Sequence, residues 1–357
     1  MKALLSTLPS TLRTRYDEDI ALLDTTFVRV WAIIGIVLAL LLPQFLSNYW
    51  AGVLNETLIV IVGALALNLL MGTTGQISLG HAGFVAVGAF TVAVLLSWTA
   101  LPIFIPLVAA ALVGAVLGVF VGLPALRLKG LYLAVSTLAA HFVIVVALGQ
   151  YQAFVSYGSG FTIDPPSVLG VALTSERRWS YFLLPVALAV LVINANWLRS
   201  AYGRAWLAIK NKEVAAEALG VNAPKFKLMA FSASTSLTCF AGGLWAYHTG
   251  FVSIEAFDFN MLVQFLAVVI IGGLGSLPGV VFGSILVVVL PHLISSAMEA
   301  SPLLKASGAQ VFEVQNLLFG AAMLAFLILE PRGLAGIWGR LRYYFELWPF
   351  KTRSWNS

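Results

Sequence analysis

The polar residues with the clearest chemical potential stand in two glycine-rich stretches of an otherwise apolar chain. The first is GTTGQISLGHAGF, residues 72–84, and the second is VIIGGLGSLPG, residues 269–279. Glycine adopts backbone conformations that interrupt a helix, and an interrupted helix offers backbone groups to a polar solute at membrane depth. A helix N-terminus suits the carboxylate of an amino acid. These stretches therefore predict a path along which a polar solute crosses a membrane.

Three hydrogen-bonding side chains and the glycines around them are the expected lining of a translocation path. They are Gly72, Gly75, Gln76, Ser78, Gly80 and His81 in the first stretch and Gly272, Gly273 and Gly275 in the second. The alternative is that the glycines only let helices pack closely. Other polar residues in apolar segments more often join helices than face a path, namely Asn55, Glu56, Asn68, Gln264, His141, His248 and His292.

Catalytic and metal chemistry find no support in the residue pattern. No two histidines have metal spacing on one helix, and the single cysteine, Cys239, can form neither a disulfide nor a cysteine metal site within the chain. There is no G-x-S-x-G nucleophile motif and no G-x-x-x-x-G-K-[ST] phosphate loop. We therefore expect no catalytic residue, no metal and no cofactor in this chain, and an external source of energy.

Membrane-spanning helices must position these residues, because 60% of the chain is apolar and only 10% is charged. A span needs about 20 mostly apolar residues. Ten segments qualify, and eight or nine true crossings remain open because some segments are short or rich in glycine. The predicted spans are 27–46, 53–71, 80–98, 102–123, 131–151, 180–198, 228–251, 259–275, 280–298 and 315–329. The expected fold class is an all-α polytopic membrane protein with glycine-interrupted helices.

The distribution of charge predicts that both termini are cytoplasmic. Ten crossings from a cytoplasmic start put Arg127, Lys129, the basic loop 199–227 and the basic C-terminal segment on the cytoplasmic side, as positive residues prefer. The expected domains are a tail over 1–26, a permease domain over 27–330 with a long loop at 200–227, and a tail over 331–357. The net charge of +5 is thereby assigned to cytoplasmic loops and lipid, not to nucleic acid.

The loop over residues 200–227 differs in composition from its flanks and predicts short helices. Good helix formers fill 204–219, and Gly220 suits a helix end. One interpretation is an interfacial helix that uses Trp206 and basic residues to hold lipid. The other is a docking helix for a separate soluble subunit.

These three stretches, in this order, resemble the branched-chain amino acid (LivM-type) permeases of bacterial ABC importers. The loop sequence GRAWLAIKNKEVAAEALGVN, residues 203–222, resembles that family's coupling loop. Importer permeases carry an E-A-A-x-x-x-G pattern there; Ala215, Ala216 and Gly220 keep its spacing, whereas Val214 takes the Glu position and Glu213 lies one residue earlier. The resemblance implies ATPase-coupling roles for Arg204, Glu213, Ala215, Ala216, Glu217 and Gly220.

The same resemblance implies a bacterial inner-membrane complex. It comprises this chain, a second related permease, two ATPase subunits that bind ATP and Mg²⁺, and a periplasmic solute-binding protein. This chain would form half of the path for branched-chain or related amino acids. Two alternatives stay open: the same architecture for urea, amides or other small solutes, and an ion-coupled secondary transporter or facilitator. The scarcity of mid-span acids, Glu56 near an edge apart, weakens ion coupling.

Overall fold

The computed structural model describes residues 26–99, 101–126, 128, 130–168, 170–300, 317, 320, 321, 324, 328 and 333–347. Most of these residues are helical, as the fold class predicts. The helices are α3 (Thr26–Phe45), α4 (Asn48–Asn68), the π-helix η1 (Leu69–Thr73), α5 (His81–Trp98), α6 (Phe104–Ala125), α7 (Leu131–Ser156), α8 (Glu176–Arg199), α9 (Ala201–Asn211), α10 (Glu213–Ala218), α11 (Ala223–Thr249), the 3₁₀-helix η2 (Ile254–Ala256), α12 (Phe259–Gly272), α13 (Leu277–Ala300) and α16 (Gly333–Leu347).

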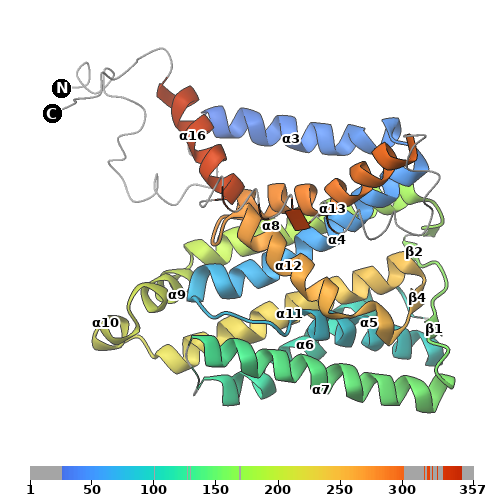
Figure 1. The fold of residues 1–357 in the computed structure, drawn as a ribbon, viewed down its shortest axis with the longest axis horizontal. Helices are drawn as coiled ribbons and strands as arrows, with labels where there is room; N and C mark the ends of the chain where they lie inside the picture. The colour runs from blue at the N-terminus through green and yellow to red at the C-terminus, as the bar shows by residue number, and fades with distance from the viewer. Residues whose placement is uncertain are drawn as a thin grey trace.

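Four two-residue strands join loops at one end of the bundle. β1 (Phe161–Thr162) pairs antiparallel with β4 (Phe251–Val252), and β2 (Ser167–Val168) pairs antiparallel with β3 (Val171–Ala172). They lie at the end opposite to α9 and α10 (Figure 1). The bundle therefore has one end built of short strands and another built of short helices.

Seven of the described helical segments are long and apolar enough to cross a membrane. They are Asn48–Thr73, His81–Trp98, Phe104–Pro124, Leu131–Ser156, Glu176–Arg199, Ile254–Gly272 and Leu277–Ser296. The long helix α11 is not among them, because hydroxyl side chains such as Ser234 and Thr235 run through its middle. The predicted span 315–329 lies outside the described residues except for a few helical positions.

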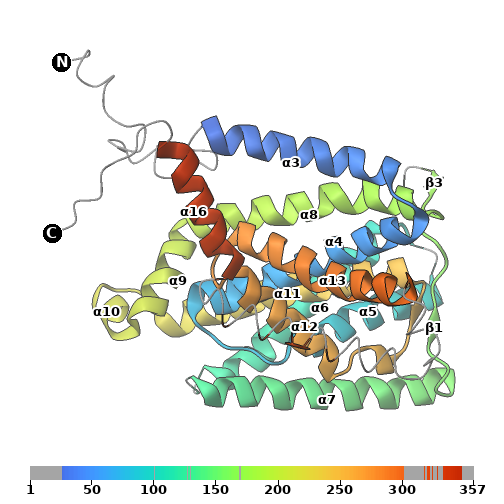
Figure 2. The same ribbon diagram turned by 45° about the horizontal axis from the view of Figure 1, so that its top comes forward.

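Two central helices, α4 and α11, organise the bundle. α11 packs against α4, α5 and α6, while α4 also packs against α8, α12 and α13. The helices α3 and α7 lie on opposite outer sides (Figures 1 and 2). In the most apolar 18 residues of the α4 segment, 89% are buried, whereas in those of α7 only 22% are buried. The α4 segment is therefore enclosed by protein, while α7 presents most of its apolar surface outward.

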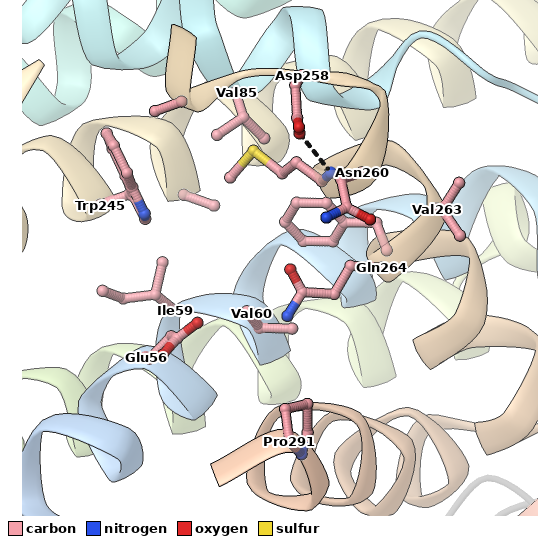
Figure 3. Close-up of a pocket in the computed structure, with 14 residues that line it drawn as sticks. Glu56, Ile59, Val60, Val85, Trp245, Asp258, Asn260, Val263, Gln264 and Pro291 are labelled. Carbon is pink, nitrogen blue, oxygen red and sulfur yellow. Dashed lines mark hydrogen bonds between the residues drawn. The ribbon is translucent and has the colours of Figure 1, made fainter. Parts of the chain in front are cut away.

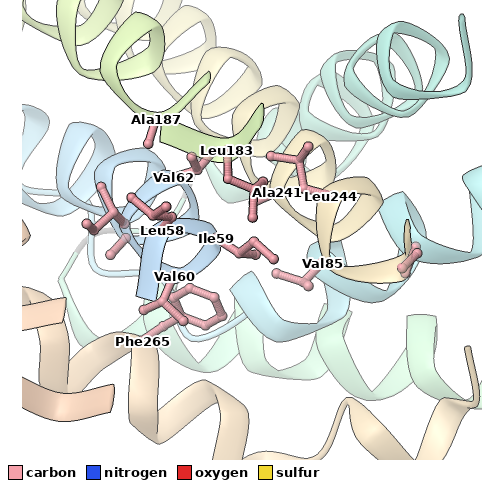
Figure 4. Close-up of a cluster of buried hydrophobic side chains, with 14 of the residues drawn as sticks. Leu58, Ile59, Val60, Val62, Val85, Leu183, Ala187, Ala241, Leu244 and Phe265 are labelled. Carbon is pink, nitrogen blue, oxygen red and sulfur yellow. The ribbon is translucent and has the colours of Figure 1, made fainter. Parts of the chain in front are cut away.

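The hydrophobic core fills the space between α4, α5, α8, α11 and α12. Leu58 and Val62 of α4 lie beside Leu183 of α8 and Leu244 of α11 (Figure 4). Outside this core, large apolar side chains on α3, α6 and α7 are exposed, for example Phe120 at 69%. A soluble protein rarely leaves so much apolar surface in contact with water, whereas lipid accepts it.

Small residues allow α5 and α6 to approach α11 closely. A methyl group on Gly114 would lie 2.6 Å from the carbonyl oxygen of Thr235, and one on Gly88 would overlap the backbone of Cys239. Gly83 and Gly88 interrupt no span, since α5 is continuous from His81 to Trp98. At these two positions close packing explains the glycine.

Candidate functional site

The long loop folds into two short helices, α9 and α10, which confirms the prediction of short helices at 200–227. Ser200 caps α9 by accepting a hydrogen bond from the Gly203 N–H, and Asn222 caps α11 by accepting one from the Lys225 N–H. Trp206 is only 3% exposed, and its indole N–H donates to the Phe226 carbonyl at 2.9 Å. Trp206 thus fixes α9 to the bundle and does not reach lipid.

The charged residues implied to couple an ATPase lie on both helices. Arg204 is exposed and donates to the Arg199 carbonyl at the end of α8, at 2.9 Å. Glu213 opens α10 and pairs with Lys227 of α11 at 2.6 Å, while Glu217 is exposed. The ion pair holds the start of α10 against the start of α11.

The small residues of the same motif divide between packing and exposure. Ala216 is 2% exposed and packs in a small cluster with Ile209 and Ala223, whereas Ala215 is exposed. Gly220 ends α10 with a φ of +88°, a left-handed conformation that favours glycine. Its role in turning the chain is therefore visible in the backbone.

The first glycine-rich stretch interrupts the helical structure between α4 and α5, as predicted. The α-helix ends at Asn68, a π-helical turn follows to Thr73, and a stretch without regular structure over residues 75–80 leads to α5, which begins inside the bundle (Figure 2). Gly75 has a φ of +70°, and Leu79 N–H donates to the Thr137 hydroxyl of α7 at 2.9 Å. We call residues 69–80 the first break.

The polar side chains of the first break are buried and bonded within the chain. His81 shares hydrogen bonds of 3.1 Å with the hydroxyls of Ser78 and Ser234, and Ser234 donates to the Ala66 carbonyl at 2.6 Å. Gln76 donates to the Lys227 carbonyl at 3.3 Å. In this conformation these groups tie the first break to α4 and α11, and their place along a path remains a prediction.

The second glycine-rich stretch forms the sharp link between α12 and α13. Gly272 ends α12, and Gly273 and Gly275 have φ values of +107° and +86°. A methyl group on Gly333 would lie 2.6 Å from the Ile271 carbonyl, so the start of α16 also meets this link. We call residues 272–276 the second break.

The two breaks contact each other directly. The Asn68 side-chain oxygen accepts the Gly275 N–H at 2.8 Å. A methyl group on Gly72 would lie 2.5 Å from the Gly275 nitrogen, far inside van der Waals contact. Both positions therefore require glycine, and stretches 200 residues apart in sequence form one backbone junction.

Lys210 of α9 reaches this junction. Its ammonium donates to the Gly72 carbonyl at 2.6 Å, and a methyl group on Gly275 would lie 3.8 Å from the same nitrogen. The sequence reasoning did not select Lys210. A usable signal existed, because Gly203, Trp206 and Lys210 follow at i, i+3 and i+7 on one face of α9, and the first two are buried.

Some other polar residues join helices at the strand end of the bundle. Asn55 of α4 donates to the Glu176 carboxylate at 2.7 Å and accepts from Ser180 at 2.7 Å. His248 of α11 contacts the same Glu176 carboxylate at 3.0 Å. These bonds link α4, α8 and α11. Among the described residues, no three His, Cys, Asp or Glu side chains gather closely enough to hold a metal.

Comparison with known proteins gives a consistent result. Residues 49–327 match the family described as branched-chain amino acid transport system / permease component. The chain is 32% identical over 324 residues to the high-affinity branched-chain amino acid transport system permease protein LivM of Salmonella typhimurium, covering 84% of this chain and 73% of the relative. The LivM protein of Escherichia coli is also 32% identical, over 342 residues that cover 87% and 76%.

A more distant relative carries a different name within the same kind of system. The probable branched-chain amino acid transport permease protein LivH of Methanocaldococcus jannaschii is 22% identical over 307 residues, covering 81% of this chain and 92% of the relative. No solved structure matches the chain.

Proposed function

Because the chain belongs to the permease-component family of branched-chain amino acid transport systems, we propose that it forms half of an ATP-driven import path for branched-chain amino acids. A second, related permease supplies the other half, two ATPase subunits bind ATP and Mg²⁺ at the cytoplasmic side, and a periplasmic binding protein delivers the solute. The resemblance of this chain both to LivM and to LivH proteins supports pairing of two related permeases.

The observation that carries the proposal is the contact between Lys210 and the junction of the two breaks. α9 and α10 lie outside the membrane bundle at one end, yet the Lys210 ammonium lies 2.6 Å from the Gly72 carbonyl. A displacement of α9 would therefore be transmitted through Lys210 both to the end of the α4 segment and to the α12 to α13 link. A facilitator, which is not driven by an ATPase, would not need a contact that links α9 to both breaks.

The exposed surface of α10 suits a soluble partner. Val214 is 78% exposed and Leu219 is 85% exposed, beside the exposed Glu217. Apolar side chains on a short, well-anchored helix are typical of a protein contact, and the ion pair between Glu213 and Lys227 holds that helix in place. We assign the ATPase contact to this surface, with Arg204, Ala215, Ala216 and Gly220 shaping it.

The same arrangement supports an inner-membrane location with both termini in the cytoplasm. The beginning of α3 and the whole of α16 lie toward the end of the bundle that carries α9 and α10 (Figures 1 and 2). That end also holds the basic residues Arg204, Lys210 and Lys227, as the positive-inside rule requires of a cytoplasmic face.

Reconstitution tests the proposal. The chain is affinity-purified from its native membrane with its bound subunits, incorporated into ATP-loaded vesicles, and supplied with binding protein and radioactive L-leucine. We expect a P-loop ATPase and a second permease to copurify, and we expect uptake to need ATP and binding protein together. Uptake driven by an ion gradient alone, or downhill flux without ATP, would refute it. A solute panel that includes urea and amides then tests the amino-acid assignment.

A further inference from the structure

A cavity of about 320 Å³ lies on the strand side of the two breaks, between α4, α5, α11, α12 and α13. Glu56 is the ninth residue of α4, so it lies about 12 Å along the helix from its Asn48 end. Gln264 is the sixth residue of α12 and lies about 8 Å from its start. Both helices begin at the strand end of the bundle. The cavity is therefore on the side opposite to α9 and α10, within the outer half of the bundle.

The polar part of the cavity carries both an acid and amides. The Glu56 carboxylate lies on one wall, and the amides of Gln264 and Asn260 lie across from it (Figure 3). Trp245 also lines the cavity and directs its indole nitrogen toward it in the same view. The Asp258 carboxylate is held by the Met261 N–H at 3.0 Å, as the cap of α12. Asp258 also lines the space, but because its carboxylate already caps α12, we take Glu56 as the acid available to a ligand.

The remaining walls are apolar. Ile59 and Val60 of α4, Val85 of α5 and Phe265 of α12 line the space. Phe265 is 4% exposed, and its ring fills the room that a side chain on Gly63 would need. That contact packs α12 closely against α4 beside the cavity.

The shape and chemistry fit one class of small molecule. Ligand cavities typically begin at about 300 Å³ and combine apolar walls with a few placed polar groups. A zwitterionic amino acid needs an acceptor for its ammonium, donors for its carboxylate and an apolar surface for an aliphatic side chain. The cavity offers all three.

We propose that this cavity is a transit site for a free aliphatic amino acid, with Glu56 accepting from the ammonium and Gln264, Asn260 and the Trp245 indole donating to the carboxylate. The aliphatic side chain rests on the Ile59, Val60 and Phe265 surface. The assignment rests on the proposed function, which it deepens by placing solute recognition inside the permease. His292 lies 3.5 Å from Glu56 and bonds to the Tyr49 hydroxyl at 2.9 Å, which holds the carboxylate in position.

The single cysteine of the chain makes a direct test practical. Cys239→Ser keeps a donor for the Phe84 carbonyl, which the thiol reaches at 3.0 Å, and gives a cysteine-free chain. Val263→Cys then places a reporter at the cavity edge (Figure 3). The purified importer complex, without binding protein, is treated with methyl methanethiosulfonate while L-leucine is titrated.

L-Leucine should slow the labelling of the Val263→Cys reporter in a saturable manner. The analogue 4-methyl-2-oxopentanoate, which lacks the ammonium, should not protect. Glu56→Gln should raise the half-protecting L-leucine concentration at least tenfold, equivalent to about 1.4 kcal/mol. The control Asp164→Asn, at an exposed loop position of the strand end, should leave it unchanged.

Several results would overturn the proposal. They are labelling that ignores L-leucine, equal protection by the oxo acid, and a reporter blocked at all times, since an acyl chain or a partner side chain would then fill the cavity. ATP-driven uptake is measured on the same preparation. Uptake without protection refutes this site alone, whereas loss of uptake in the unmodified complex refutes the proposed function. Because the analogue comparison uses the native Glu56, it stays informative if Glu56→Gln does not assemble.

Discussion

Replacing Lys210 with Met should uncouple ATP hydrolysis from transport. The Lys210 ammonium donates to the Gly72 carbonyl at 2.6 Å, and Met keeps the length of the side chain while removing its charge and its donor. A hydrogen bond from a charged group contributes about 1.5–3 kcal/mol. More than a third of Lys210 is exposed, so we discount that figure to about 1–1.4 kcal/mol.

That free energy corresponds to a change of about 5- to 10-fold in the balance between conformations that keep or lose the contact. The assay is ATP hydrolysis by the reconstituted complex, with and without solute-loaded binding protein. We expect Lys210→Met to lower the stimulated rate about 5- to 10-fold while the basal rate and the recovery of ATPase subunits stay normal. Uptake of L-leucine should fall in parallel.

Lys212→Met is the matched control for this experiment. Lys212 lies two residues further along and is exposed, so its replacement removes the same charge without touching the junction. If both variants keep full stimulation, the contact between Lys210 and Gly72 does not couple ATP hydrolysis to the movement of the breaks. If both lose it equally, the effect is one of surface charge.

Three further outcomes follow from the same geometry. Gly72→Ala should destabilise the solubilised protein by about 1–3 kcal/mol, because the methyl group meets the Gly275 backbone; Gly35→Ala, with open space around it, should unfold at the wild-type temperature, and equal melting curves would refute the junction. His81→Ala should lower thermal stability by about 1–3 kcal/mol, because it removes two buried hydrogen bonds, to the Ser78 and Ser234 hydroxyls, and it should reduce uptake; unchanged melting and uptake would contradict this. Gly220→Pro cannot adopt a φ of +88° and should abolish ATPase binding in a pull-down while membrane insertion persists; retained binding would count against α10.

The helical segments could be predicted closely because their ends carry local signals. The span expected at 80–98 is α5, His81–Trp98, and the one expected from 259 begins with α12 at Phe259. The helix stop at Gly220 was likewise predictable from glycine. The resemblance to LivM-type permeases, based on three short stretches, is confirmed by the family match over residues 49–327.

The facing of each helix could not be predicted. A helix that is apolar all round carries no stripe to orient it, so nothing in the sequence distinguishes Gly72, which meets another break, from Gly88, which only lets two helices pack. The cavity could not be predicted from the sequence for the same reason. Glu56 and Gln264 stand 208 positions apart, and each alone reads as an interfacial or interhelical residue.

The polarity of α11 has a consequence for how the protein is made. This helix runs for 27 residues, yet its buried Ser234, Thr235 and Thr238 make it a poor substrate for direct transfer into hydrocarbon. Its neighbours α4, α5 and α6 all precede it in the chain. During biosynthesis the helices that pack against α11 are therefore inserted into the membrane first. We infer that α11 then inserts against these helices and not directly into lipid. An internal deletion of α4, α5 and α6 should therefore leave α11 at the membrane surface.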